Sequence, residues 1–239
     1  MNRREVLELG LSASMLFLTG GRMIAQRLTS ARDAVDHLLL GCADLQRGIA
    51  WVEARTGVRA AIGGSHPGRG TRNALLGLDG RQYLEIIAPD PTQAGVPRPE
   101  LSSLQDPRLI GWASDSRDLA TLVRTARAAG VQMSDPQDGS RQRPDGRTVR
   151  WRTAEPDERL ESDGISPVPF FIEWAADALH PSADSPAGCR LTECVFEHPR
   201  PGALQDQLKR LGIDATVADA PRPALVARLV TAKGTITIR

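Results

Sequence analysis

The 239-residue chain is poor in lysine, in aromatic side chains and in cysteine. Only two of its 30 basic residues are lysines, and this bias runs along the whole chain, which indicates codon preference rather than a binding patch. The formal net charge is +1, so the charge balance gives no reason to expect nucleic acid or an acidic membrane surface as a partner. Cys42, Cys189 and Cys194 are scattered without CxxC spacing. That pattern argues against a disulfide framework or a zinc cluster and favours buried free thiols.

The N-terminal residues differ in kind from the rest of the chain. Arg3 and Arg4 precede a mostly apolar or small stretch, residues 9–18, which is too short to span a bilayer as a helix but long enough for the apolar part of a secretory signal. The arginine pair resembles a twin-arginine export signal, although acidic neighbours and the lack of a clean A-x-A site depart from that pattern. We therefore expect residues 1–31 to be a signal-like segment of a periplasmic or exported protein, with no stable membrane insertion after processing. The alternative is an attached amphipathic helix on a cytoplasmic protein.

After about residue 33 the chain repeats one order of elements three times. Each repeat begins with an apolar strand, continues with an amphipathic helix, and leaves that helix at a glycine followed by an aliphatic residue. Module one, residues 33–92, has predicted strands at 35–41, 58–62, 73–78 and 82–88, a helix at 44–57 and a glycine turn at 79–80. Module two, residues 107–182, has strands at 109–113, 147–153 and 168–174 and a helix at 118–129. Module three, residues 189–239, is shorter, with strands at 191–196, 224–230 and 235–238 and a helix at 202–211.

This repetition predicts an α+β fold made of βαβββ modules. Each module has one apolar sheet face and one helix, so it cannot bury its apolar surface alone. Two modules paired into a curved, cupped sheet bury that surface and leave a concave face that suits a small-molecule ligand. The third module has no partner of its own kind within the chain. It therefore covers an edge or pairs with another subunit, and the second arrangement would produce a homodimer.

Three ionisable residues, His37, Glu85 and Glu173, interrupt otherwise apolar strands. An unpaired carboxylate at the centre of a strand is costly to desolvate. We therefore expect the three side chains to converge on one cavity, where a cation, a shared proton or water satisfies them. A histidine nitrogen with carboxylate oxygens is a ligand set for Mn²⁺, Fe²⁺, Ni²⁺ or Zn²⁺. The predicted metal ligands are His37, Glu85 and Glu173.

Local motifs surround these residues: Asp36-His37 in the first strand, Tyr83-Leu84-Glu85-Ile86 in the fourth, the glycine-rich segment 64–73, and the segments 83–91, 169–174 and 180–182. Together they resemble the vicinal-oxygen-chelate superfamily, and in particular its glyoxalase-like domain family, over roughly residues 35–182. The resemblance implies one glyoxalase-like domain at 32–182 with metal ligands at His37 and Glu85. It also implies substrate contacts from His66, Arg69, Thr71, Asn73 and His180, although His180 alternatively marks the end of a loop.

The resemblance has one departure, in module two. Metal sites of the superfamily usually take a ligand from the first strand of each paired module. In module two the position that matches His37 falls at Ile110, Gly111 or Trp112, and none of these side chains binds a metal.

Two functions follow from these observations. The first is a metal-assisted lyase, isomerase or dioxygenase-like enzyme that acts on a small oxygen-rich molecule, with a divalent metal ion and with Glu85 and Glu173 as catalytic carboxylates. The second is a metal-free protein that binds or sequesters a small molecule. The sequence has no dinucleotide fingerprint and no P-loop, so no nucleotide cofactor is expected. Trp151 and Trp174 are expected to pack in the core.

Overall fold

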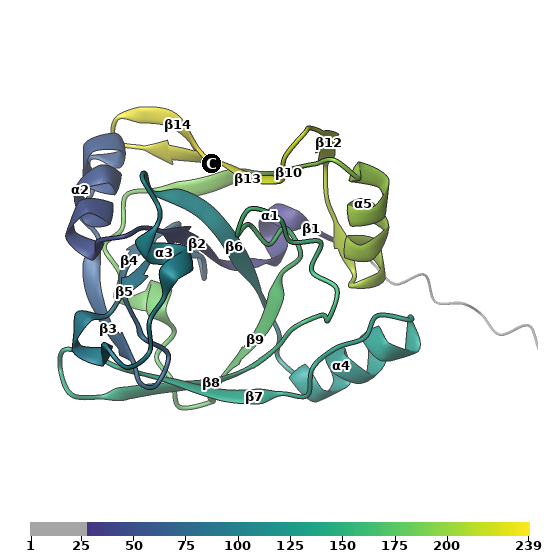
Figure 1. The fold of residues 1–239 in the computed structure, drawn as a ribbon, viewed down its shortest axis with the longest axis horizontal. Coiled ribbons are helices and arrows are strands. Elements are labelled where there is room, and N and C mark those ends of the chain that lie inside the picture. The colour runs from purple at the N-terminus through teal and green to yellow at the C-terminus, as the bar shows by residue number, and fades with distance from the viewer. Residues whose placement is uncertain (1–27) are drawn as a thin grey trace, which may run out of the picture.

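The computed structural model describes residues 28–239, so the predicted signal-like segment lies almost entirely outside the described residues. The described chain forms a closed barrel of two βαβββ modules with a smaller sheet on its outside (Figure 1). The predicted α+β fold of paired modules is therefore confirmed. Within residues 28–239 no helix is both long and apolar enough to cross a membrane.

Module one has the predicted order of one strand, one helix and three strands. Its elements are β2 (Val35–Gly41), α2 (Leu45–Thr56), β3 (Ala61–His66), β4 (Thr71–Gly77) and β5 (Tyr83–Pro89). Helix α2 begins after Asp44, whose carboxylate accepts a hydrogen bond from the backbone N–H of Arg47 at 2.8 Å, and it ends at Gly57 in the left-handed conformation. The chain then turns between β4 and β5 with positive φ at Asp79 and Gly80, as the glycine turn predicts.

The second strand of module one is displaced from its predicted position. We expected a strand at 58–62 followed by a long glycine-rich loop, but β3 extends to His66 and β4 begins at Thr71. Only residues 67–70 form the turn between them. Side chains that the sequence placed in the loop, such as those of His66 and Thr71, therefore lie on hydrogen-bonded strands with fixed directions.

Module two repeats the same order. Its elements are β6 (Arg108–Asp115), α4 (Leu119–Ala128), β7 (Gln137–Gln142), β8 (Thr148–Ala154) and β9 (Phe170–Trp174). The connection from module one contains the short 3-10 turn η1 (Pro91–Gln93) and the single-turn helix α3 (Pro99–Ser102). Strand β7, with the sequence QDGSRQ, was not predicted because its side chains show no apolar alternation.

The two modules join edge to edge to close the barrel. The strand orders are β2-β5-β4-β3 in module one and β6-β9-β8-β7 in module two, so each first strand lies next to its fourth strand. Strands β2 and β6 pair antiparallel with His37 opposite Ala113, and β3 meets β7 through Ser65 and Gln142. Helix α2 packs outside β4 and β5, and α4 packs outside β8 and β9. The inside of the barrel is therefore the shared concave surface.

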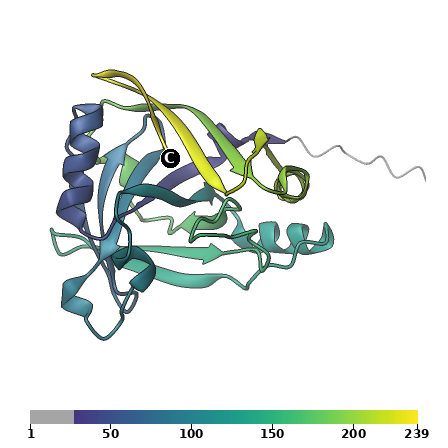
Figure 2. The same ribbon diagram turned by 45° about the horizontal axis from the view of Figure 1, so that its top comes forward.

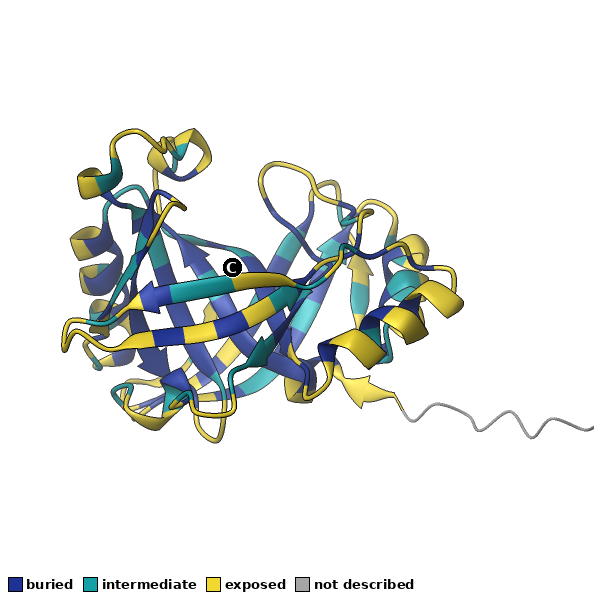
Figure 3. Cartoon of the chain, turned by 90° about the horizontal axis from the view of Figure 1, so that it is seen from below, coloured by how far each residue is buried: buried dark blue, intermediate teal, exposed yellow. Residues whose placement is uncertain are grey.

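The third module packs against the outside of the barrel (Figures 1 and 2). Its elements are β10 (Arg190–His198), α5 (Pro201–Arg210), β11 (Ile213–Asp214), β12 (Val217–Asp219), β13 (Ala224–Thr231) and β14 (Gly234–Ile238), preceded by the 3-10 turn η2 (Pro181–Ala183). The sheet order β12-β10-β13-β14 differs from that of the other modules, since the chain returns from α5 directly to the side of β10. Buried and exposed residues alternate along β13, which faces the barrel with one side (Figure 3).

Several contacts attach the third sheet to the barrel, and two of them involve β6. Trp112, on the outer face of β6, lies with its ring centroid 5.5 Å from that of Phe196 on β10. At the other end, the backbone N–H of Leu109 donates to the carbonyl oxygen of Arg239 at 2.9 Å. The first described residues join the same region: β1 (Thr29–Ser30) pairs with β11, and α1 (Ala31–Ala34) contacts β10.

Candidate functional site

The barrel encloses a cavity of about 450 Å³, a size typical of small-molecule sites. Because side chains alternate along a strand, every second residue of β2, β5 and β9 points into it. One side of the cavity is polar and is formed by His37, His66, Asn73 and Glu85. Module two contributes the apolar and aromatic side chains Trp151, Phe170, Ile172 and Trp174, together with polar residues such as Glu155 and Arg159.

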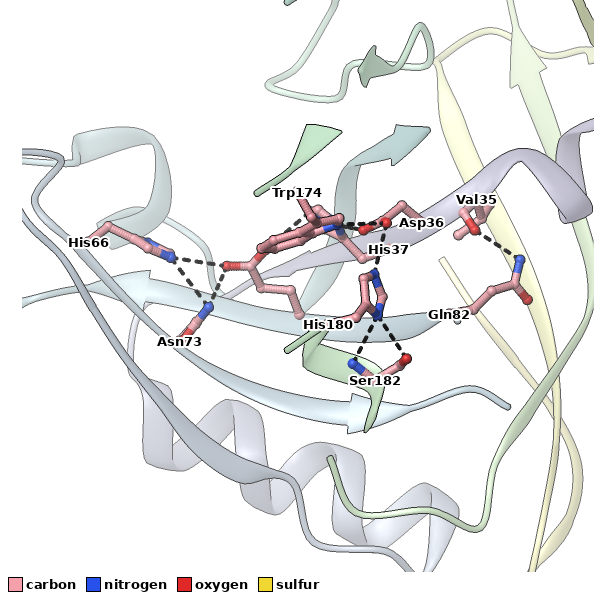
Figure 4. A network of polar contacts seen from close by, with 10 residues as sticks. Val35, Asp36, His37, His66, Asn73, Gln82, Trp174, His180 and Ser182 are labelled. Carbon is pink, nitrogen blue, oxygen red and sulfur yellow. Dashed lines mark hydrogen bonds and ion pairs between the residues drawn. The ribbon is translucent and has the colours of Figure 1, made fainter. Parts of the chain in front are cut away.

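Asp36 is a buried carboxylate that joins three side chains (Figure 4). Its Oδ1 accepts a hydrogen bond from His37 Nδ1 at 2.6 Å, and its Oδ2 accepts from His180 Nε2 and Trp174 Nε1, both at 3.0 Å. The register between β2 and β6 shifts after Val35, which makes Asp36 an extra residue in its strand and redirects its side chain. Burial alone would raise the pKa of Asp36, but the hydrogen bonds from His180 and His37 outweigh it and lower the pKa.

The partners of the two histidines define their tautomers. An ionised carboxylate only accepts hydrogen bonds, so His37 Nδ1 and His180 Nε2 each carry a hydrogen toward Asp36. On the far side of His180, Nδ1 accepts from the backbone N–H of Ser182 at 3.3 Å and lies 2.8 Å from its hydroxyl oxygen. The remaining nitrogen, His37 Nε2, faces the cavity. Asp36 therefore holds His37 in one orientation, with its second nitrogen available for chemistry.

Glu85 lies next to that nitrogen on β5. Its Oε2 is 3.3 Å from His37 Nε2, and its Oε1 is 3.6 Å from His66 Nε2 and accepts a hydrogen bond from Asn73 Nδ2 at 2.7 Å. Burial would raise the pKa of Glu85, but the charges of His37 and His66 and the amide of Asn73 stabilise the carboxylate and lower it. The expectation that His37 and Glu85 share one cavity is confirmed.

The glycine-rich segment completes the polar wall. His66 Nδ1 lies 2.9 Å from Thr71 Oγ1, and burial lowers the pKa of His66 against the opposing effect of Glu85. The predicted contact residues His66, Arg69, Thr71 and Asn73 all line the cavity. Their contact with a substrate stays a prediction. The fifth predicted residue, His180, lies behind Asp36 and is not part of the lining.

Arg141 of β7 was missed by the sequence reasoning. It is 3% exposed and lines the cavity, where its Nη1 donates to Asn73 Oδ1 at 3.3 Å. Burial lowers the pKa of Arg141, and the nearby Glu85 carboxylate opposes that shift. The repeated order of elements could have predicted β7. In module one the helix ends at Gly57 and β3 follows, so in module two a strand is expected after the helix that ends near Gly130.

The position of Glu173 contradicts the predicted convergence. On β9 the inward residues are Phe170, Ile172 and Trp174, so Glu173 points out of the barrel. Its Oε2 accepts from the backbone N–H of Leu119 at 2.6 Å, and its Oε1 accepts from Arg152 at 2.5 Å. The carboxylate therefore stabilises the N-terminus of α4. Glu173 is satisfied there and does not share the cavity with His37.

Strand pairing within the modules identifies the true counterparts. In module one His37 lies opposite Tyr83, and in module two Ala113 lies opposite Phe170. Counting along the fourth strands from these pairs, Ile172 corresponds to Glu85. The sequence placed the match to His37 at one of residues 110–112. The structure corrects this, because the matching position is Ala113. The consequence is unchanged, because alanine supplies no metal ligand.

The side chains present do not fit the predicted divalent metal ion. Within residues 28–239 no group of three His, Cys, Asp or Glu side chains has a geometry that could hold one. The nearest set is His37, Glu85 and His66, but there the amide of Asn73 already donates to Glu85 and also reaches His66. The buried charge of Arg141 further disfavours a second cation beside Glu85.

A closed barrel of two βαβββ modules around a small-molecule cavity defines a protein of the vicinal-oxygen-chelate type. The family model described as a glyoxalase-like domain matches residues 35–212, which is most of the chain. The chain therefore belongs to the glyoxalase-like domain family. The match reaches beyond the predicted end at residue 182 and includes β10 and α5. A search of curated protein sequences finds no match.

Solved structures share the fold at low identity. A hypothetical protein from Staphylococcus aureus is 12% identical with a TM-score of 0.62, over 86% of this chain and 98% of that one. Methylmalonyl-CoA epimerase from Streptomyces coelicolor is 18% identical with a TM-score of 0.43, over 62% of this chain and 99% of that one. The epimerase from Mycobacterium tuberculosis is 20% identical with a TM-score of 0.42, over 64% and 94%. At 12% identity the likeness to the first of these concerns the fold alone.

Proposed function

We propose that this protein is a proton-transfer enzyme of the isomerase or lyase type, acting on a small oxygen-rich molecule inside the barrel. The observation that carries the proposal is the buried row Asp36, His37 and Glu85, whose last two members face the cavity. Buried acid–base groups that contact one another and face a cavity are typical of catalytic sites. The unfavourable fit of a metal ion favours acid–base chemistry carried by the side chains themselves.

Each residue has a distinct part in this mechanism. Glu85 accepts a proton from a substrate carbon next to a carbonyl group, and the electron pair of that C–H bond moves onto the carbonyl oxygen to give an enolate. The positive charge of Arg141 stabilises the developing oxyanion. His37, held by Asp36, shares a proton with Glu85 through Nε2. Return of the proton to carbon gives an isomer, and loss of a leaving group from the enolate gives a lyase product.

The test is exchange of the substrate proton with deuterated water, followed by proton NMR on a panel of small 2-oxo acids. The full chain is expected to speed loss of the signal from the hydrogen on the carbon next to the carbonyl. Glu85→Gln should slow this exchange by at least about 100-fold, the usual contribution of a general base. The matched control is Glu173→Gln, the same change outside the barrel, which should leave the exchange rate unaltered.

Binding is measured in the same samples through the fluorescence of Trp151 and Trp174, which line the cavity. Compounds that bind without exchanging would contradict catalysis and support the metal-free binding protein instead. Exchange that stops after chelator treatment and returns with Mn²⁺ or Zn²⁺ would support the metal-assisted enzyme instead. Exchange that persists in chelator and disappears in Glu85→Gln is the result expected here.

A further inference from the structure

We propose that Arg141 is the anchor for a carboxylate group of the ligand, so that the cavity takes a small organic carboxylate with an apolar or aromatic body. This inference rests on the proposed function for the use of the cavity, and it names the class of ligand. It assigns a binding role to a residue on β7, a strand that carries no other candidate site residue.

Arg141 is an almost completely buried cation whose hydrogen-bonding capacity is mostly unused. A guanidinium has five N–H donors, and its one side-chain hydrogen bond within residues 28–239 goes to the neutral amide oxygen of Asn73. No carboxylate in that part of the chain forms an ion pair with it; Glu85 acts on it only from a longer distance. A buried charge normally has a paired counter-charge. The free donors face the cavity, where a ligand would supply that counter-charge.

The surrounding backbone is shaped to admit this side chain. A Cβ atom on Gly63 of β3 would lie 2.3 Å from Arg141 Nη1 and 2.3 Å from Asn73 Oδ1. A Cβ atom on Gly139 of β7 would lie 2.4 Å from the indole nitrogen of Trp151. Side chains at these two positions would displace the guanidinium and the indole. The bare backbone therefore makes room for a cation and an aromatic ring side by side.

The other arginines that line the cavity are less suited to the role. Arg98 is paired with Glu100, Arg159 is paired with Glu155, and Arg69 is exposed at the rim. Arg141 is thus the buried cation of the lining that forms no ion pair with a carboxylate among the described residues.

The chemistry of the walls restricts the ligand further. A carboxylate matches the planar fork of a guanidinium. A phosphate dianion would place more negative charge next to the ionised Glu85 and Asp36, which disfavours it. Beside the polar residues, Trp151, Phe170 and Ile172 offer apolar surface for the rest of the molecule; the rings of Phe170 and Trp151 lie 5.6 Å from that of His37 and 6.1 Å from that of His66, respectively. The inferred ligand therefore has a single carboxylate at one end and a planar or apolar group at the other.

Calorimetry with the full chain tests this directly with three probes that share a phenyl group: 3-phenylpropanoate, its neutral amide of the same shape, and phenyl phosphate. The carboxylate should bind at least about tenfold more tightly than the amide, as expected for hydrogen bonds to a charged group. Arg141→Gln should abolish that preference. Arg141→Lys, which keeps the charge but loses the fork, should retain part of it. Arg150→Gln, an exposed arginine on the neighbouring strand β8, is the matched control and should change nothing.

Equal binding of carboxylate and amide, or a preference that survives in Arg141→Gln, would overturn the inference. Tighter binding of phenyl phosphate would overturn the choice of carboxylate. If Arg141→Gln does not fold, the Arg141→Lys result decides alone, because an unchanged preference there would rule out fork recognition. The outcome is separate from catalysis: carboxylate binding that persists without proton exchange contradicts the proposed enzyme and leaves the Arg141 anchor standing.

Discussion

Replacing Asp36 by asparagine should be costly although the two side chains have the same shape. The wild-type carboxylate accepts from His37, His180 and Trp174 and is 1% exposed. The single oxygen of asparagine can accept from at most His180 and Trp174, the two donors that share Oδ2 in the wild type. The NH₂ group then faces the Nδ1–H of His37, which has lost its acceptor. Hydrogen bonds to a buried charge contribute about 1.5–3 kcal/mol each, so we expect a loss of about 3 kcal/mol in the free energy of unfolding.

The pH dependence of that loss follows from the direction of the pKa shift. The pKa of Asp36 is lowered in the folded protein, so the stabilising effect of its charge is fully present above the unfolded pKa of about 3.9 and is lost as pH falls toward the folded pKa. The difference between wild type and Asp36→Asn should therefore be largest above about pH 5 and smaller at pH 3. Urea unfolding at both pH values measures it.

A matched control and a second readout make this prediction decisive. Asp184→Asn is the same change in a partly exposed ion pair with Arg143 and should cost no more than about 1 kcal/mol. Nitrogen-15 NMR of labelled histidine should report a hydrogen on Nδ1 of His37 in the wild type and a different tautomer balance in Asp36→Asn. If Asp36→Asn were as mild as the control, or left the His37 tautomer unchanged, the carboxylate would not be organising the site.

Three further predictions concern the contact between β3 and β7, the third sheet and the N-terminus. Gly64→Ala should lower the melting temperature, because a Cβ there would lie 1.8 Å from a carbonyl oxygen of β7 and the residue has a φ of 135°. Trp112→Ala should cost about 3–5 kcal/mol in urea unfolding, since it removes the buried contact with Phe196 that attaches the third sheet. A reporter fused behind residues 1–30 should reach the periplasm and stay in the cytoplasm after Arg3→Lys/Arg4→Lys; equal localisation of both fusions would contradict twin-arginine export.

Helices and turns were predictable because their signals are local. Asp44 and Asp118 accept hydrogen bonds from the first turns of α2 and α4, and Gly57 adopts the left-handed conformation that ends α2. Each of these residues acts through neighbours a few positions away, so sequence alone places them. The repeat of the same signals along the chain then indicated the paired modules.

The candidate site was less predictable because it depends on which face of a strand turns inward. β9 has apolar residues at Phe170, Phe171 and Ile172, so it is apolar on both faces and its alternation gives no direction. Glu173 was placed inside on analogy with Glu85, and the pairing of the strands puts it outside. The bulge at Asp36 was missed for a related reason, since it depends on the pairing between the modules. The strand that carries Arg141 was missed because its polar side chains show no apolar alternation.

The polar side of the cavity does not end at the boundary between the modules. Polar groups continue from β2, β5, β4 and β3 across the contact between β3 and β7 to Arg141, and aromatic side chains line the cavity from both modules, Tyr83 on β5 and Trp151 on β8. This continuity is possible because Gly63 and Gly64 leave space where β3 meets β7, next to Arg141 and Gln142. A repeated scaffold would by itself give two equivalent half-sites. Here Ala113 and Ile172 occupy the positions that match His37 and Glu85, so this acid–base pair has no counterpart in module two and a bound molecule meets it from one side of the cavity.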